Sequence, residues 1–329
     1  MKQHHALFAN FILRFGDKEL IDYAESILIP ALTHAGQVRK YGKRTEYFIY
    51  KGELVRLDDH EGVPAMAVIG QFIKKTQLVR HQVFEADKGP IADEASLASA
   101  PSAFFVLMLS NHRLIYFPEA PDAPDLTSFK ATVKRFIGDR YKDFIDELYR
   151  DGRQREEPMT KTALRKIHKS PTLEIIPLTG ADSISAFVNR YKVLKSIEFR
   201  IVKPNSEIDG HAIFKQLRQL SDDLESHDTR LRTANNDGLD KDASTQKISE
   251  ATEQGNQEVT LDGIDHEGNK LRGNNDEFKI SAPIGKPPAA KLSLAKRLYQ
   301  AFSALTANGT IKIDKPHPRV IDAMNGLAE

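Results

Sequence analysis

The clearest pattern in the chain is the alternation of apolar and polar positions near its start. Apolar side chains occupy every second position between residues 6 and 15, which is typical of a half-buried strand. A later run, Phe104 to Leu109, is apolar throughout and is followed, after a short polar turn, by Leu114 to Phe117. This pattern predicts a hairpin whose first strand is buried on both faces.

Apolar residues spaced three and four apart predict helices in other segments. The longest should begin after Asp125, a favourable N-cap residue, and continue through Leu148. Further helices are predicted after Gly16-Asp17, after Asp209, and from Leu292 to Leu305. These amphipathic stripes indicate helices that cover sheets.

Several other segments are predicted to be extended or irregular. A hairpin is expected around Lys51-Gly52, and residues 86–102, which are rich in Ala, Ser and Pro, are expected to form a loop. Short strands are expected at 65–84, 173–178, 193–202, 229–233 and 310–313. Strands and helices mix without βαβ regularity, so we predict an α+β fold with mainly antiparallel sheets, packed helices and two subdomains.

The length of 329 residues exceeds the usual size of a single core. We therefore divide the chain into an N-terminal α+β domain, residues 1–151, and a basic α+β central or dimer region, residues 152–234. Residues 235–288 are expected to be an acidic, flexible excursion and linker, because residues 235–276 are polar with few aromatic side chains. A C-terminal helix and tail, residues 289–329, complete the chain.

Charge is segregated along the sequence although the net charge is only +1. Residues 152–203 hold eleven Lys and Arg against five acids, residues 204–279 hold nine against seventeen, and residues 280–329 hold seven against three. A nearly neutral chain can therefore carry a basic surface. If the basic clusters share one face, they would suit a phosphate backbone, whereas separate clusters would be ordinary solvated charges. The candidate DNA contacts are Arg39, Lys40, Lys43, Arg44, Arg165, Lys166, Lys169, Lys192, Lys195, Arg230 and Arg232.

The motifs of common enzymes and cofactor sites are missing from the sequence. It contains no cysteine, which excludes disulfides, thiolate metal sites and a cysteine nucleophile. It also lacks a glycine-rich phosphate loop and a Gly-x-Ser-x-Gly elbow. We therefore expect no catalytic residue, no cofactor and no metal. The start does not resemble a signal peptide, and no apolar run approaches the roughly 20 residues that span a bilayer, so a cytoplasmic location is expected.

One pattern supports an alternative, enzymatic reading. Asp265 precedes Glu277-Phe278-Lys279, and nucleases of the PD-(D/E)xK type use such carboxylates to hold Mg²⁺ and such a lysine to activate water. Glu277 and Lys279 would lie on one face if this segment were a strand. Asp265 falls in a polar turn, where rigid placement is harder to achieve.

The order of elements resembles that of RexA-like phage exclusion proteins. The resemblance rests on residues 102–109, 114–117 and 124–129, together with 46–52, 193–205 and the insertion 263–269. It implies a homodimer that binds double-stranded DNA without sequence preference, with a fold similar to that of RdgC, a ring-shaped nucleoid protein. It also implies a membrane-protein partner encoded nearby, and it implies no catalytic residue.

Three functions therefore remain open at this stage. The first is a sequence-nonspecific DNA-binding protein of phage exclusion or antiphage defence. The second is the metal-dependent nuclease centred on Glu277 and Lys279. The third is an adaptor that senses a phage component through residues 235–276.

Overall fold

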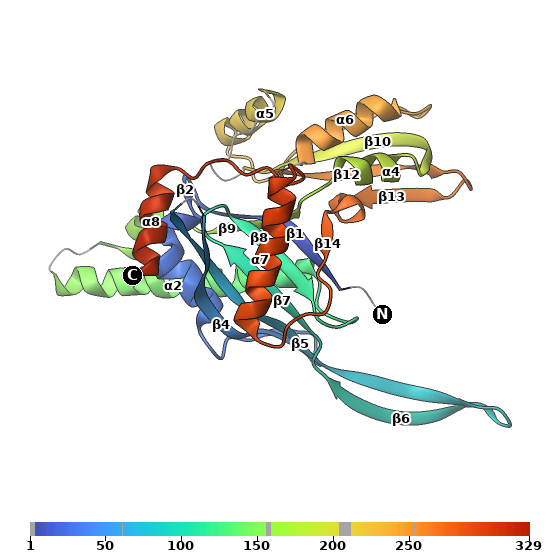
Figure 1. The fold of residues 1–329 in the computed structure, drawn as a ribbon, viewed down its shortest axis with the longest axis horizontal. Coiled ribbons are helices and arrows are strands. Elements are labelled where there is room, and N and C mark those ends of the chain that lie inside the picture. The colour runs from blue at the N-terminus through green and yellow to red at the C-terminus, as the bar shows by residue number, and fades with distance from the viewer. Residues whose placement is uncertain (1–3, 61, 156–158, 204–211, 253) are drawn as a thin grey trace.

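The protein contains two antiparallel β-sheets with helices packed against them (Figure 1). This computed structural model describes residues 4–60, 62–155, 159–203, 212–252 and 254–329. Every strand pair in the described residues is antiparallel. The predicted α+β class is therefore confirmed.

The larger sheet has the order β14-β1-β8-β7-β5-β4-β3, with β2 and β9 also paired to β1 and β6 paired to β5. Its strands are β1 (His5–Phe15), β2 (Lys18–Glu19), β3 (Arg39–Tyr41), β4 (Thr45–His60), β5 (Val63–Glu85), β6 (Gly89–Ser99), β7 (Ser102–Met108), β8 (Arg113–Pro118), β9 (Thr172–Pro177) and β14 (Ser281–Pro283). The predicted hairpin of β7 and β8 lies at the centre. Its side chains are buried on both faces, as the continuous apolar run predicts.

Helices cover both faces of the larger sheet. Phe105 and Leu107 of β7 share a core with α2 (Leu126–Gln154) and α8 (Pro318–Ala328), whereas Phe104 and Val106 pack with α7 (Lys291–Ala307). The first core also holds the helical segment η1 (Leu20–Tyr23), η2 (Ala24–Leu28) and α1 (Ile29–Thr33). In the described parts of the chain, no helix has the length and apolar character needed to cross a membrane.

The long helix α2 begins where the sequence predicts. The Asp125 carboxylate accepts the backbone N–H of Ser128 at 2.7 Å, which satisfies one of the free donors of the first turn. Phe129, Val133 and Phe136 then face the sheet at helical spacing.

The smaller sheet has the order β11-β10-β12-β13 and a core of its own. Its strands are β10 (Tyr191–Ile201), β11 (Thr229–Ala234), β12 (Gln257–Asp265) and β13 (Lys270–Asn274). Helices α4 (Ala181–Val188), α5 (Ala212–Asp223), α6 (Lys241–Thr252) and η3 (Asn275–Phe278) contribute to that core. The chain enters this unit after β9 and leaves it at β14, and both of these strands pair with β1. Strand β1 therefore holds both ends of the insertion.

Two local predictions about the first half of the chain are wrong. Lys51 and Gly52 form no hairpin turn, because β4 continues through them with a shift of register between Tyr50 and Glu53. A Cβ atom at Gly52 would lie 2.0 Å from the carbonyl oxygen of Leu32, so the glycine allows α1 to pack against the strand. Residues 86–102 are also not a loop, because β6 pairs with β5 in a long two-stranded arm.

The segment expected to be a flexible acidic excursion is instead part of a folded unit. Its apolar residues are few, but Ile248, Val259 and Leu261 are all buried in the core of the smaller sheet. On β12 the acidic side chains Glu258 and Asp262 occupy alternate positions between the buried ones. The sheet joins β10 and β11 to β12 and β13, so it crosses the boundary that the sequence suggests near residue 234.

The end of the chain also differs from expectation. Residues 310–313 form no strand; Ile311 instead packs into the second core of the larger sheet, and α8 follows. The predicted N-cap Asp209 lies outside the described residues, and α5 is described from Ala212.

Replacing Gly273 by Ala should destabilise the protein by about 1–3 kcal/mol, the usual effect of overpacking a core. A Cβ atom there would lie 2.1 Å from the Phe187 ring, which Tyr191 and Phe278 hold from other sides. Chemical denaturation measures the effect. Gly138→Ala in α2 is the control, because nothing lies within 4 Å of the added atom and alanine favours a helix by up to about 1 kcal/mol. Equal stability of Gly273→Ala and wild type would contradict this core.

Candidate nucleic-acid interface

The first predicted basic cluster lies at the outer edge of the larger sheet. Arg39 and Lys40 belong to the edge strand β3, and Lys43 and Arg44 lie in the turn to β4. Arg39 is partly engaged, because its guanidinium lies 5.6 Å from the centroids of the Tyr41 and Tyr47 rings. The other three cations are exposed, and in the described residues they have no ion-pair partner.

The second predicted cluster lies on α3 (Lys161–Ile167) and the residues that follow it. Arg165, Lys166 and Lys169 are exposed, and none forms an ion pair with a residue that the structure describes. The side chain of Lys169 crosses the turn after β1, because a Cβ atom at Gly16 would lie 2.8 Å from its Cγ. That turn leads to the exposed Lys18. We call Lys18, Arg165, Lys166 and Lys169 the α3 patch.

His168 fixes the position of the α3 patch. Its Nδ1 lies 2.8 Å from the Tyr23 hydroxyl, and its backbone oxygen accepts a hydrogen bond from Tyr141 at 2.6 Å. Its ring also meets the ring of Phe144 edge to face. Burial, with a smaller effect of the nearby Lys18 ammonium, lowers the pKa of His168 from its ordinary value. These contacts join the end of α3 to η1 and α2, so the cations next to it are held on a rigid base.

The third predicted group is divided between two strands of the smaller sheet, with Lys192 and Lys195 on β10 and Arg230 and Arg232 on β11. Arg230 is neutralised, because its guanidinium pairs with Glu198 at 2.7 Å and Asp228 at 2.9 Å. Arg232 lies directly opposite Glu198 in the register. Lys192 is six residues along β10 from Glu198. At the usual rise of a strand this is roughly 20 Å, so Lys192 is distant from the carboxylate that neutralises Arg230.

The three clusters do not form one continuous surface. Strand β3 is the last strand at one edge of the larger sheet, whereas β9, which follows α3, pairs with β1 near the other edge. Helix α2 separates β3 from β9: Thr132 accepts a hydrogen bond from Arg39, and Lys130 forms an ion pair with Glu174 of β9. The α3 patch thus brings together four exposed cations that have no ion pair with a described residue and that lie on a rigid base. Lys18 is not among the contacts predicted from the sequence, because only the folded turn after β1 places it beside α3.

The residues of the nuclease pattern do not come together. Glu277 lies in η3, whose N-cap residue Asn274 pairs with Thr260 of β12. Asp265 is five residues further along β12, which is roughly 17 Å from the start of η3. Ligands of one Mg²⁺ ion bind at about 2.0–2.1 Å from it. Glu277 is also in a 3₁₀ helix, so the predicted placement of Glu277 and Lys279 on one strand face is wrong.

Asp265 has a structural role at the end of β12. One of its carboxylate oxygens accepts the backbone N–H groups of Glu267 and Asn269, at 2.9 and 2.8 Å, and this closes the turn to β13. The Asn269 hydrogen bond is the largest of the effects that lower the pKa of Asp265. No group of three or more metal-binding His, Asp or Glu side chains occurs within the described ranges.

Buried polar side chains join the two sheets. The Asn10 amide of β1 donates to Gly255 O at 3.4 Å and to Asn256 Oδ1 at 3.2 Å, and Arg113 of β8 donates to the Gln254 side chain at 2.9 Å. His112 precedes Arg113 in a left-handed conformation with φ of +57°. Burial, with smaller effects of Arg113 and Arg14, lowers the pKa of His112 to about 3. These hydrogen bonds fix the small unit, which is the smaller sheet with the helices between β9 and β14, on β1 and β8.

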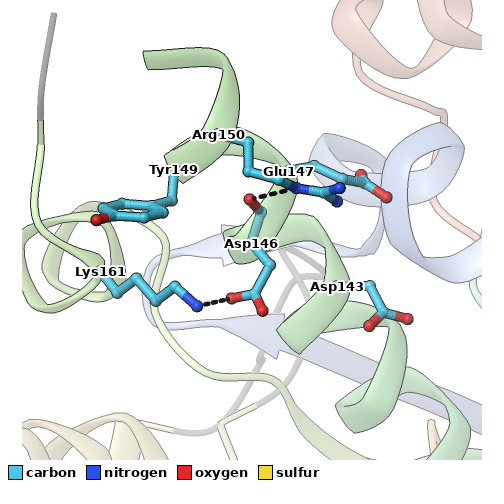
Figure 2. Close-up of a pocket in the computed structure, with 6 residues that line it drawn as sticks. All are labelled: Asp143, Asp146, Glu147, Tyr149, Arg150 and Lys161. Carbon is cyan, nitrogen blue, oxygen red and sulfur yellow. Dashed lines mark hydrogen bonds and ion pairs between the residues drawn. The ribbon is translucent and has the colours of Figure 1, made fainter. Parts of the chain in front are cut away.

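An open hollow near the end of α2 is lined by three acidic side chains together with Tyr149, Arg150 and Lys161 (Figure 2). Lys161 pairs with Asp146 at 2.7 Å, and the Arg150 guanidinium donates to the Asp146 backbone oxygen at 3.2 Å, so both cations are engaged. Asp143 and Glu147 lie on the same helix. Such a lining does not favour a phosphate group.

Comparison with protein-family models finds one match, to a domain of unknown function (DUF4747), over residues 159–301. The matched region contains α3, β9, the smaller sheet and β14, and it ends within α7. Strand β1, which pairs with both β9 and β14, lies outside it. No curated protein matches the chain.

The buried His112 should make stability depend on pH between about 3 and 6.5. Its pKa is lower in the folded protein than the ordinary value of 6.5, so the unfolded chain binds a proton first as pH falls. Folded-state stability is therefore complete above pH 6.5 and declines on acidification, by at most about 1.4 kcal/mol per pH unit from this group. His112→Asn, which tolerates a positive φ, should flatten this slope in urea titrations at several pH values.

The exposed His227 provides the control for this experiment, through the variant His227→Asn. A slope that is the same in wild type and His112→Asn would show that His112 does not carry the effect.

Proposed function

We propose that the protein binds double-stranded DNA through the phosphate backbone, without sequence preference, as a cytoplasmic component of phage exclusion or antiphage defence. The observation that carries this proposal is the α3 patch, where Lys18, Arg165, Lys166 and Lys169 are exposed without ion-pair partners among the described residues. The resemblance to RexA-like exclusion proteins supports the cellular role. It also suggests a two-chain assembly and a membrane-protein partner encoded nearby.

The physical basis would be the release of counterions from DNA. Lys and Arg that neutralise phosphates displace condensed cations, so the logarithm of the binding constant falls linearly with the logarithm of salt concentration, by about 0.9 for each phosphate contacted. Four contacts per chain correspond to a slope of roughly −3.6, and two chains on one duplex to about twice that. Such contacts position a protein on DNA but carry no sequence information.

The arrangement of the other basic clusters is consistent with a secondary contribution to DNA binding. Lys40, Lys43 and Arg44 are exposed at the far edge of the larger sheet. They can reach a second segment of a long duplex rather than the same phosphates. Arg230, neutralised by Glu198 and Asp228, should contribute little.

Binding to unrelated duplexes at low salt should weaken about equally for all of them when the α3 patch is removed. The triple variant Arg165→Ala, Lys166→Ala and Lys169→Ala should reduce the slope of log affinity against log salt by about 2.7. Fluorescence anisotropy over a series of salt concentrations measures both quantities.

A matched triple variant keeps the change in net charge identical. Lys142, Lys247 and Arg272 are ion-paired with Asp139, Glu250 and Asp262, so replacing them by Ala should leave the salt slope nearly unchanged. The proposal fails if wild type does not bind at low salt, or if both triple variants lose the same affinity.

A further inference from the structure

The arm formed by β5 and β6 extends away from the body of the molecule (Figure 1). Its two strands pair from Thr76–Ser99 at the base to Glu85–Gly89 at the tip. The nine residue-to-residue steps from Thr76 to Glu85 give the arm a length of roughly 30 Å. In the described chain β6 pairs with β5 alone, so this part of the ribbon is two strands wide.

The register of the arm assigns its apolar side chains to faces. Leu78 lies directly opposite Leu97, and Phe84 lies opposite Pro90. Opposed residues of an antiparallel pair share a face, and the even-numbered β5 residues from Leu78 to Phe84 continue on it. Strand β6 has a bulge at Asp93 and Glu94, between Ala95, which pairs with Arg80, and Ala92, which pairs with Gln82. The extra residue keeps the Leu78–Leu97 pair and the Phe84–Pro90 pair on the same face of the ribbon.

Both ends of this face carry exposed apolar side chains, with Arg80 and Gln82 between them. The exposed fractions of Leu78, Phe84 and Leu97 are 54%, 75% and 66%. An isolated two-stranded ribbon is only marginally stable in water, and clustered apolar side chains on its surface indicate an interaction site. The arm therefore fits a protein surface.

Charge along the arm runs from basic at the base to acidic toward the tip. The base comprises the β3–β4 turn and Lys74-Lys75, with Lys40, Lys43 and Arg44, so it has five cations against Glu46. A hydrogen bond of 3.0 Å between the Thr45 and Thr76 hydroxyls joins the turn to the arm. Residues 76–99 hold two cations against four acids. This acidic arm does not suit DNA, and its charge gradient is complementary to that of an inverted copy.

We propose that the arms of two copies of this chain lie antiparallel about a two-fold axis, apolar face to apolar face. In this arrangement Leu78 and Leu97 near the base of one arm meet Phe84 and Pro90 near the tip of the other. Asp87, which lies in the turn at the tip and has no ion pair with a described residue, approaches the partner's base. A two-fold interface requires a self-complementary surface, and in this arrangement apolar side chains meet at both ends while the acidic tip meets the basic base.

The inference supplies an interface for the two-chain part of the proposed function and rests on that part alone. It does not depend on DNA binding by the α3 patch, which lies near the opposite edge of the sheet from β3 and the base of the arm. In the dimer, Lys43 and Arg44 would face the partner's tip and not a second segment of duplex.

The mass of the protein in solution, measured by sedimentation over a range of concentrations, tests the apolar contact. Wild type should be a dimer, and the double variant Phe84→Asp with Leu97→Asp should weaken association roughly 100-fold or more, as expected at the centre of an interface. The control is Leu220→Asp with Leu224→Asp, in the last turn of α5 and just after it, which places two acids at exposed leucines elsewhere. An unchanged thermal unfolding midpoint of the arm variant shows that its body is folded.

Charge reversal tests the antiparallel arrangement itself. A base variant, Lys43→Glu with Arg44→Glu, and a tip variant, Glu85→Lys with Asp87→Lys, should each associate with themselves roughly tenfold or more weakly, because like charges then meet. Mixing the two variants should restore a dimer. The acidic base of the base variant then meets the basic tip of the tip variant, and the unaltered base of the tip variant meets the unaltered tip of the base variant.

Three results would overturn the inference. A monomeric wild type would remove both the arm interface and the proposed two-chain assembly, while DNA binding would still be decided by anisotropy. A dimer that is insensitive to Phe84→Asp with Leu97→Asp, or that is lost in the α5 control instead, would remove the arm interface alone. Failure of the mixed charge variants to associate would exclude the antiparallel pairing.

Discussion

The pairing of strand β1 is the constraint on which the rest of the structure depends. Its side chains are buried on both faces from Phe8 to Leu13, and its backbone pairs with β2, β8, β9 and β14. The small unit between β9 and β14 is attached to the larger sheet through both of those strands, and each of them pairs with β1. The region that matches a family model, residues 159–301, therefore needs a strand that the match does not include.

Polar contacts, rather than a continuous apolar core, set the position of the small unit. Arg200 of β10 forms ion pairs with Glu174 of β9 and Glu258 of β12, each at 2.7 Å. The hydrogen bonds of Asn10 on β1 and Arg113 on β8 are a second set of polar contacts to the small unit. Glu174 is mostly buried, and the hydrogen bonds from Arg200 and Lys130 outweigh burial, so its pKa is lowered. Glu174 also pairs with Lys130, so the contacts form a network that joins α2, β9, β10 and β12 in one geometry.

This geometry separates the two surfaces to which we assign functions. The α3 patch is held near β1 by the contacts of His168 with Tyr23 and Tyr141, whereas the arm begins at the opposite side of the sheet, next to β3 and β4. One surface carries unpaired cations on a rigid base and suits a polyanion. The other carries apolar side chains with an acidic tip and suits a protein. Two chains joined by their arms would therefore keep both α3 patches free.

The sequence by itself determined the α+β class, the central hairpin of β7 and β8, and helix α2 with its cap at Asp125, because these depend on local periodicity and on hydrogen bonds within four residues. Tertiary structure decided the rest. Only pairing with β5 turns the Ala- and Ser-rich residues 89–99 into a strand, and only burial against β10 orders the acidic segment around Val259. The basic residues were visible in the sequence, but their grouping was not: Lys18 joins the α3 patch and Arg230 is neutralised through contacts between residues distant in the chain.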